Sequence, residues 1–69
     1  MLKHIDDDKY ISDSGETIQR EFGLSPEGNK LWGEWVYRDS KGNWIDYKQY
    51  RYDLFEKYGF KDSEIVNEF

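Results

Sequence analysis

Hydrophobic and polar residues alternate along residues 31–38 and again along residues 43–47, and a turn signal separates these two segments. The intervening residues 39–43 (DSKGN) begin with an aspartate and carry a glycine where a left-handed backbone is needed. This arrangement is typical of a type I turn closed by a glycine bulge. The pattern therefore predicts a β-hairpin over residues 31–47.

The turn sets the register of this hairpin, with Arg38 opposite Trp44 and Trp35 opposite Tyr47. Because side chains alternate across a strand, the hairpin has two faces. One face carries no charge and is expected to form the core: Leu31, Gly33, Trp35, Tyr37, Ile45 and Tyr47. The other face mixes rings with charges: Trp32, Glu34, Val36, Arg38, Trp44 and Asp46. On this second face, Arg38 is expected to lie over Trp44 as a cation–π pair worth about 0.5–1 kcal/mol. Trp35 is thus interpreted as structural, and Trp32 and Trp44 as candidates for contact with a partner.

A helix is predicted over residues 47–58, packed on the uncharged hairpin face. Tyr50, Leu54 and Tyr58 recur at helical spacing, and Arg51 and Phe55 extend this stripe. Gly59 fits a left-handed cap at its C-terminus, after which Phe60 would fold back toward Phe55. Tyr52 falls on the far side of the helix and is expected to be exposed.

The remaining segments complete a single domain over residues 1–69. Residues 9–22 predict a second hairpin turning at residues 13–15, with four apolar contributors: Tyr10, Ile11, Ile18 and Phe22. The segment SPEGN at residues 25–29 suits a turn, and the tail from residue 62 suggests a short helical turn. Residues 1–8 are expected to be a loose acidic segment. The predicted fold class is therefore α+β: a small antiparallel sheet of two hairpins packed on one main α-helix, with a short C-terminal helical turn.

Size and composition change how the aromatic residues are interpreted. A domain of 69 residues buries only about 60% of the surface that its unfolded chain exposes, so its free energy of unfolding is small. Cysteine is absent, which excludes disulfides and thiolate metal sites. Three tryptophans, six tyrosines and four phenylalanines can replace a larger aliphatic core. Trp32 and Trp44 therefore have an alternative role as a second small core, covered by the N-terminal hairpin or by the tail around Phe69.

Charge indicates the kind of partner. The net charge is −5, and residues 1–29 carry seven acidic and three basic residues. Nucleic-acid backbones are bound by an excess of Lys and Arg, so nucleic acid is the less favoured ligand and a protein with a basic surface the more favoured one. No apolar run is long enough to span a membrane, and no membrane partner is expected. A cytoplasmic setting is expected.

Candidate chemistry is sparse. His4 is the only histidine, and no motif places a serine or carboxylate pair beside it for catalysis, so an enzyme is not expected. The acidic segment HIDDDKY fails the calcium-loop pattern, because a loop starting at Asp6 would need a ligand at Tyr10 and a glycine at Ile11. We therefore expect no metal and no cofactor.

These observations favour a small acidic, non-enzymatic protein-binding module, monomeric or weakly dimeric. In size, acidity and lack of cysteine the chain resembles the small host-directed inhibitors that phages and mobile elements encode. In that form, its acidic half would cover a basic, nucleic-acid-binding surface of a host protein. The alternative is a small nucleic-acid-binding module that combines surface aromatics with Arg and Lys. The expected partner-binding residues are Trp32, Trp44, Tyr52, Glu34, Arg38, Asp13 and Glu16.

Overall fold

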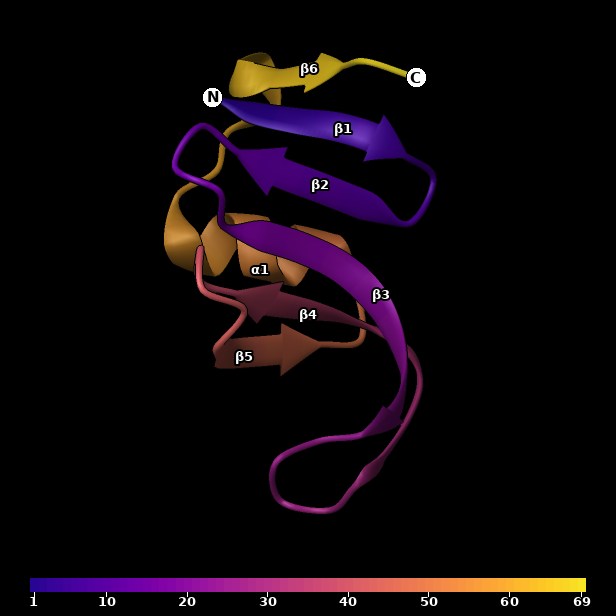
Figure 1. The fold of residues 1–69 in the computed structure, drawn as a ribbon. Coiled ribbons are helices and arrows are strands. Elements are labelled where there is room, and N and C mark those ends of the chain that lie inside the picture. Colours follow the sequence, from indigo (N-terminus) through magenta and orange to yellow (C-terminus); the bar gives the residue numbers. More distant parts are fainter.

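Six strands form one sheet, and a single helix packs against one of its faces, behind β3 and β4 in Figure 1. The computed structural model describes residues 1–69. The strands are β1 (Leu2–Asp6), β2 (Lys9–Ser12), β3 (Thr17–Leu24), β4 (Lys30–Arg38), β5 (Trp44–Lys48) and β6 (Ile65–Asn67). Helix α1 (Arg51–Tyr58) follows β5, and a 3-10 turn, η1 (Asp62–Glu64), precedes β6.

The strand order is β5-β4-β3-β2-β1-β6, and every neighbouring pair is antiparallel except β1 with β6. The predicted α+β class is confirmed, and so is the C-terminal helical turn. The prediction for the sheet is wrong in two respects. The observed sheet has more strands than two hairpins supply, and it is mixed rather than antiparallel.

The expectation of a loose segment at residues 1–8 is wrong. Leu2–Asp6 pairs with β2, and the side chain of Leu2 is only 2% exposed. His4 lies on the same side of the strand and stacks on Tyr10, with ring centroids 4.0 Å apart. The acidic residues lie at the end of β1 and in the turn that follows, where the backbone N–H of Asp8 donates to the carboxylate of Asp6.

The C-terminus adds a strand that the sequence pattern did not predict. After η1, Ile65 lies beside Leu2 in a parallel pairing between β6 and β1. Phe69 then meets the ring of His4 edge-on at 4.7 Å. The first and last strands of the chain therefore lie side by side at one edge of the sheet, with the two termini at opposite ends of this pair (Figure 1).

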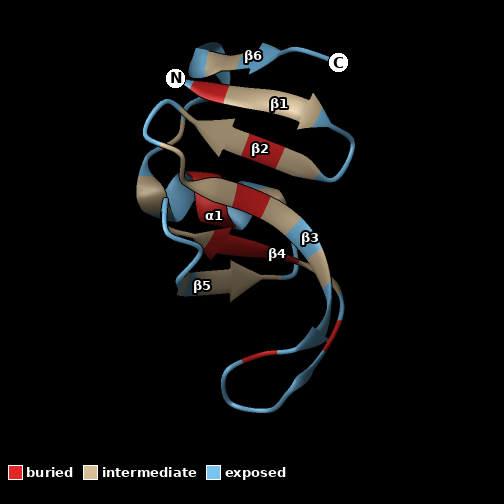
Figure 2. Cartoon of the chain, in the orientation of Figure 1, coloured by how far each residue is buried: buried red, intermediate tan, exposed pale blue.

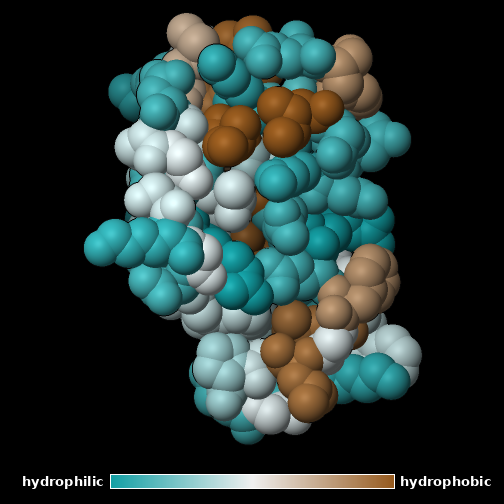
Figure 3. Space-filling view, in the orientation of Figure 1, coloured by the Kyte–Doolittle hydropathy of each residue, from teal (hydrophilic) through white to brown (hydrophobic).

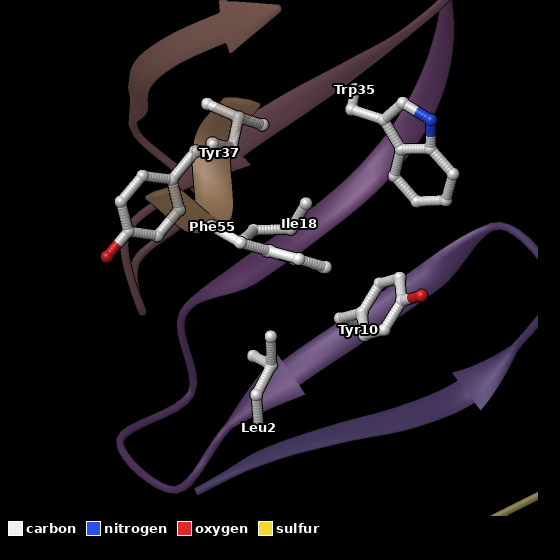
Figure 4. Close-up of a cluster of buried hydrophobic side chains, with 7 residues drawn as sticks. Leu2, Tyr10, Ile18, Trp35, Tyr37 and Phe55 are labelled. Carbon is white, nitrogen blue, oxygen red and sulfur yellow. The ribbon is translucent and has the colours of Figure 1, made fainter. Parts of the chain in front are cut away.

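The core lies between the sheet and α1. Side chains from four strands and the helix converge there: Leu2, Tyr10, Ile18, Trp35, Tyr37, Leu54 and Phe55 (Figure 4). Rings supply much of the contact, as where Tyr10 meets Phe55 edge-on at 5.1 Å. The predicted structural role of Trp35 is confirmed, since it is 5% exposed.

The helix stops as predicted and starts later than predicted. Gly59 has a φ of 76°, and Phe60 donates a backbone hydrogen bond to Phe55, with the two rings 6.3 Å apart. The start is residue 51 rather than 47, because Asp46 belongs to β5 and its carboxylate accepts hydrogen bonds from Lys57 and Tyr58. With eight residues in α1, the structure contains no helix of the length and apolarity required to cross a bilayer.

The β4–β5 turn forms as predicted, but a bulge shifts the register beyond it. Gly42 donates to the carbonyl of Asp39, and Arg38 lies opposite Trp44. An irregularity next to this pair then places Trp35 opposite Lys48 instead of Tyr47. A register slip of one residue moves side chains to the other face. Tyr47 therefore lies away from the core, 5.5 Å from Trp44, and Ile45 is 41% exposed.

A second bulge separates two residues that the sequence pattern placed together. Gly33, with a φ of 100°, is the extra residue of β4 between the pairs Glu21–Glu34 and Phe22–Trp32. Trp32 consequently lies beside Phe22, on the side of the sheet that carries α1. The prediction that Trp32 shares a face with Glu34 and Trp44 is therefore wrong.

Candidate functional site

The distal part of the β3–β4 hairpin, residues 22–32, projects beyond the rest of the sheet (Figure 1). We call it the hairpin arm. β2 pairs with β3 only at residues 17–19, and β5 pairs with β4 only from residue 35 onward. Beyond these points the two strands of the arm pair with each other alone. Figure 2 shows that the arm is mostly exposed, whereas buried residues concentrate in the middle of the sheet and in α1.

Local hydrogen bonds form the tip of the arm. The backbone N–H of Ser25 donates to the carbonyl of Asn29 at 2.8 Å, and Gly28 donates to the carbonyl of Ser25 at 2.9 Å. The hydroxyl of Ser25, which is 5% exposed, accepts from the N–H of Asn29 at 3.1 Å. The tip is thus closed by hydrogen bonds within the arm, and one arm side chain, that of Leu31 opposite Gly23, is only 2% exposed.

Three large apolar side chains project from one side of this ribbon. Phe22 and Leu24 are each 69% exposed, and Trp32 is 70% exposed. Phe22 lies opposite Trp32, and Leu24 lies opposite Lys30. Because residues two apart in a strand share a face, all four side chains belong to one surface. We call Phe22, Leu24 and Trp32 the arm patch; Figure 3 shows apolar atoms gathered over this projecting end.

Two cations lie directly against the rings of the arm patch. The ammonium of Lys30 is 4.2 Å from the centroid of Trp32, and the guanidinium of Arg20 is 5.6 Å from the centroid of Phe22. Arg20 also donates to the carbonyl of Gly33 at 3.3 Å and to the carboxylate of Asp8 at 3.2 Å. Arg20 therefore ties the base of the arm to the β1–β2 turn, whereas Lys30 forms no ion pair.

The same alternation of cation and ring continues to the start of α1. Arg20 lies opposite Trp35, and the guanidinium of Arg51 is 5.3 Å from the Trp35 ring. Arg51 also lies 4.7 Å from the ring of Tyr52 and donates to its hydroxyl at 3.0 Å. Tyr52 is 57% exposed, as predicted. We call the row from Lys30 through Arg20 to Tyr52 the cation–aromatic band.

Trp44 and Arg38 lie on the opposite face of the sheet. The Arg38 guanidinium is 5.4 Å from the Trp44 ring, so the predicted cation–π pair is confirmed. Arg38 also donates two hydrogen bonds to the carboxylate of Glu21, at 2.7 and 2.8 Å, and these raise the pKa of the guanidinium. Trp44 is partly buried and packs on Tyr47. This pair therefore serves the fold of the sheet.

The acidic residues expected at the site are engaged within the chain. Glu34 accepts the backbone N–H of Trp32 at 2.8 Å and so supports the Gly33 bulge. Asp13 pairs with the N-terminal ammonium at 3.1 Å. Glu16 accepts the hydroxyl of Tyr37 at 2.8 Å. Burial, and then this bond to Glu16, raise the pKa of Tyr37 to about 12.

The seven expected partner-binding residues thus do not form one surface. Trp32 and Tyr52 lie at the two ends of the cation–aromatic band, and the other five lie outside it. The expectation missed most of the band and the rest of the arm patch: Arg20, Phe22, Leu24, Lys30 and Arg51. The sequence did carry a signal for the arm. Two apolar residues spaced two apart, Phe22 and Leu24, precede the turn at residues 25–29, and Lys30 and Trp32 follow it at the same spacing.

Residues suited to metal or acid–base chemistry do not converge. The one hollow in the surface is lined by polar side chains only: Asp6, Asp7, Asp8, Lys9, Gln19 and Arg20. No group of three or more His, Cys, Asp or Glu is arranged to hold a metal ion. His4 is enclosed between the rings of Tyr10 and Phe69, and its buried Nε2 has no hydrogen-bond partner.

No protein-family model, no curated protein and no solved structure matches this chain. The fold and its surface define a small α+β protein with a mixed six-stranded sheet, one covering helix and an aromatic arm.

Proposed function

We propose that the protein is a non-enzymatic protein-binding module whose contact element is the hairpin arm. The observation that carries this proposal is the arm patch, in which three large apolar side chains stand about 70% exposed on one side of a two-stranded ribbon. Fully burying a side chain of this kind is worth about 1.5–3 kcal/mol. Contiguous exposed apolar groups mark interaction sites, and tryptophan is enriched among residues that dominate interfaces.

The arm is also prepared for binding before a partner arrives. The Ser25 hydroxyl closes the tip, the Glu34 carboxylate braces the Gly33 bulge, and Arg20 fixes the base. A surface already ordered in its binding conformation loses less entropy on association. This property favours recognition of a partner over a purely structural role for the exposed rings.

The finer form of the proposal is an inhibitor of phage type, cytoplasmic and either monomeric or weakly dimeric, that covers a basic surface of a host protein. It draws support from Asp6, Asp7 and Asp8, which are exposed together on the β1–β2 turn. A second candidate is binding of single-stranded nucleic acid, favoured by exposed rings that lie beside Lys30 and Arg51. The net charge of −5 opposes a polyanionic ligand and makes this the second candidate.

A retention experiment with matched variants tests the main proposal. Immobilised wild-type protein is compared with the double variant Phe22→Ser/Trp32→Ser and with the control Ile45→Ser/Val66→Ser, which also removes two exposed apolar side chains. Proteins from a lysate should be retained by the wild type and the control and released by the arm variant. Equal retention by all three would show that the arm is not the contact element. Salt-sensitive retention of an oligothymidylate that depends on Trp32 would favour the second candidate instead.

A further inference from the structure

We infer that the partner of the hairpin arm is an acidic–apolar peptide segment, with carboxylates that meet Lys30 and Arg51 and apolar side chains that cover the arm patch. This inference rests on the main form of the proposed function, binding through the hairpin arm, because it names the partner of the same surface. It is an alternative to the finer form, in which the partner surface is basic. It concerns the chemistry of the partner only, so it can fail while protein binding through the arm stands.

The first step is the state of the cations in the band. Arg20 in the band is paired with Asp8 at 3.2 Å, and outside the band Arg38 and Lys57 are paired with carboxylates at 2.7 and 2.6 Å. Lys30 and Arg51 form no ion pair, although acidic residues outnumber basic ones in the chain. Both are instead held over aromatic rings, which fixes their position without neutralising their charge. The band thus presents two placed positive charges that lack anions.

The second step is the placement of acids around the arm. Glu21 and Glu34 belong to the arm strands, but both lie on the face away from the arm patch, where Glu21 binds Arg38. Glu27 is exposed in the turn at the tip of the arm and forms no ion pair. Asp8 contacts the band from the side, through Arg20. Asp53 lies in the first turn of α1 and forms no ion pair with Arg51. The surface that carries the arm patch is therefore locally basic within an acidic protein, and it complements an acidic partner.

The third step decides between a peptide and a nucleic acid. Leu24 supplies a third of the arm patch, and it has no flat face on which a base could stack. Trp35, at the centre of the band, is 5% exposed and closed to stacking. Lys30 covers one face of Trp32. An apolar peptide side chain can use all three members of the arm patch, so the surface favours a peptide.

The test lets the arm select its own ligands from a random pool. Wild-type protein is used to select binders from a displayed random peptide library, and enriched sequences are synthesised with a fluorescent label. Their affinities are measured by fluorescence anisotropy against the wild type, Trp32→Ser, Lys30→Glu and the matched control Lys61→Glu. Lys61 is exposed, lies outside the band and forms no ion pair, so the control makes the same charge change elsewhere.

The expected result is enrichment of peptides that combine Asp or Glu with aromatic or aliphatic residues. Lys30→Glu should weaken them about tenfold, and Lys61→Glu should leave affinity within about twofold. Trp32-dependent binding of peptides that are basic or uncharged would overturn the inference and leave the proposed function standing. Tighter binding of a labelled oligothymidylate than of any selected peptide would overturn it in favour of nucleic acid. If no peptide binds in a Trp32-dependent way, the inference fails, and the retention experiment with Phe22→Ser/Trp32→Ser decides the proposed function separately.

Discussion

Trp35 and Trp32 lie three positions apart in the same strand, yet one is 5% exposed and the other 70%. Truncating each to alanine removes the same atoms from two different environments. The comparison therefore tests burial, while the chemistry of the substitution stays constant.

The magnitude follows from what each ring touches. Trp35 packs in the core with its ring 5.8 Å from that of Tyr10, and the guanidinium of Arg51 lies 5.3 Å from the Trp35 ring. Removing a buried tryptophan side chain costs about 3–5 kcal/mol. At about 0.05–0.15 kcal/mol per residue, a chain of this length has roughly 3–10 kcal/mol of total stability. Trp35→Ala should therefore lose much or all of its folded state. Trp32→Ala loses one exposed cation–π contact with Lys30 and should cost less than about 1 kcal/mol.

Urea unfolding followed by far-ultraviolet circular dichroism measures both free energies. If Trp35→Ala does not fold, Trp35→Phe keeps a ring at this position and should show a smaller but clear loss. Equal midpoints for Trp35→Phe and the wild type, or a larger loss in Trp32→Ala than in Trp35→Phe, would refute this account of the core.

Three further changes test other parts of the structure. Gly42→Val should cost about 1–2 kcal/mol, because a β-branched residue is strained at the φ of 86°; an unchanged melting temperature would contradict the turn. Leu2→Ala should cost about 2–5 kcal/mol if β1 belongs to the core, whereas a loose N-terminal segment would show no effect in a urea melt. Since the pKa of Tyr37 rises to about 12 on folding, its contribution to stability is complete below the ordinary tyrosine pKa of about 10 and is lost as the pH rises through 12. Glu16→Gln should lower the pKa of Tyr37, seen as earlier tyrosinate absorbance, and an unchanged titration would exclude that role for Glu16.

Elements set by local backbone chemistry were predictable from the sequence. The turn at Gly42 and the helix end at Gly59 each need a left-handed residue, and glycine supplies it at low cost. The same reasoning found the type I turn, the fold-back of Phe60 and the pair between Arg38 and Trp44. In each of these cases the partners lie within a few residues of one another.

Features that depend on distant parts of the chain were not predictable in this way. The β4–β5 bulge adds Ile45 to one strand, and its position depends on how Asp46 reaches Lys57 and Tyr58 in the helix. The pairing of β1 with β6 joins residues from opposite ends of the chain, and neither strand is long enough to show a clear alternation. The acidic residues that follow also made the segment around Leu2 look like a loose chain rather than a strand with a buried face.

The candidate site was predicted in part for the same physical reason. Exposure of Trp32 was expected from charges on its face, but that face was derived from a register that ignores the bulge at Gly33. Phe22 was expected as one of the apolar residues that its hairpin contributes. It is exposed because the hairpin extends past the last residue that α1 covers, and no sequence pattern states how far a helix reaches over a sheet.

The arm patch is difficult to explain by stability alone. A chain of 69 residues has little apolar surface to spare, yet Phe22, Leu24 and Trp32 remain in water while the core cluster contains seven residues. The hydrogen bonds of the arm close without these side chains, so polar residues at the same positions would preserve the ribbon and lower the risk of aggregation. Burial of these three side chains would be favourable, and it takes place only when another molecule covers them. The exposed position of the patch, next to cations without anions, is therefore better explained by recognition than by folding.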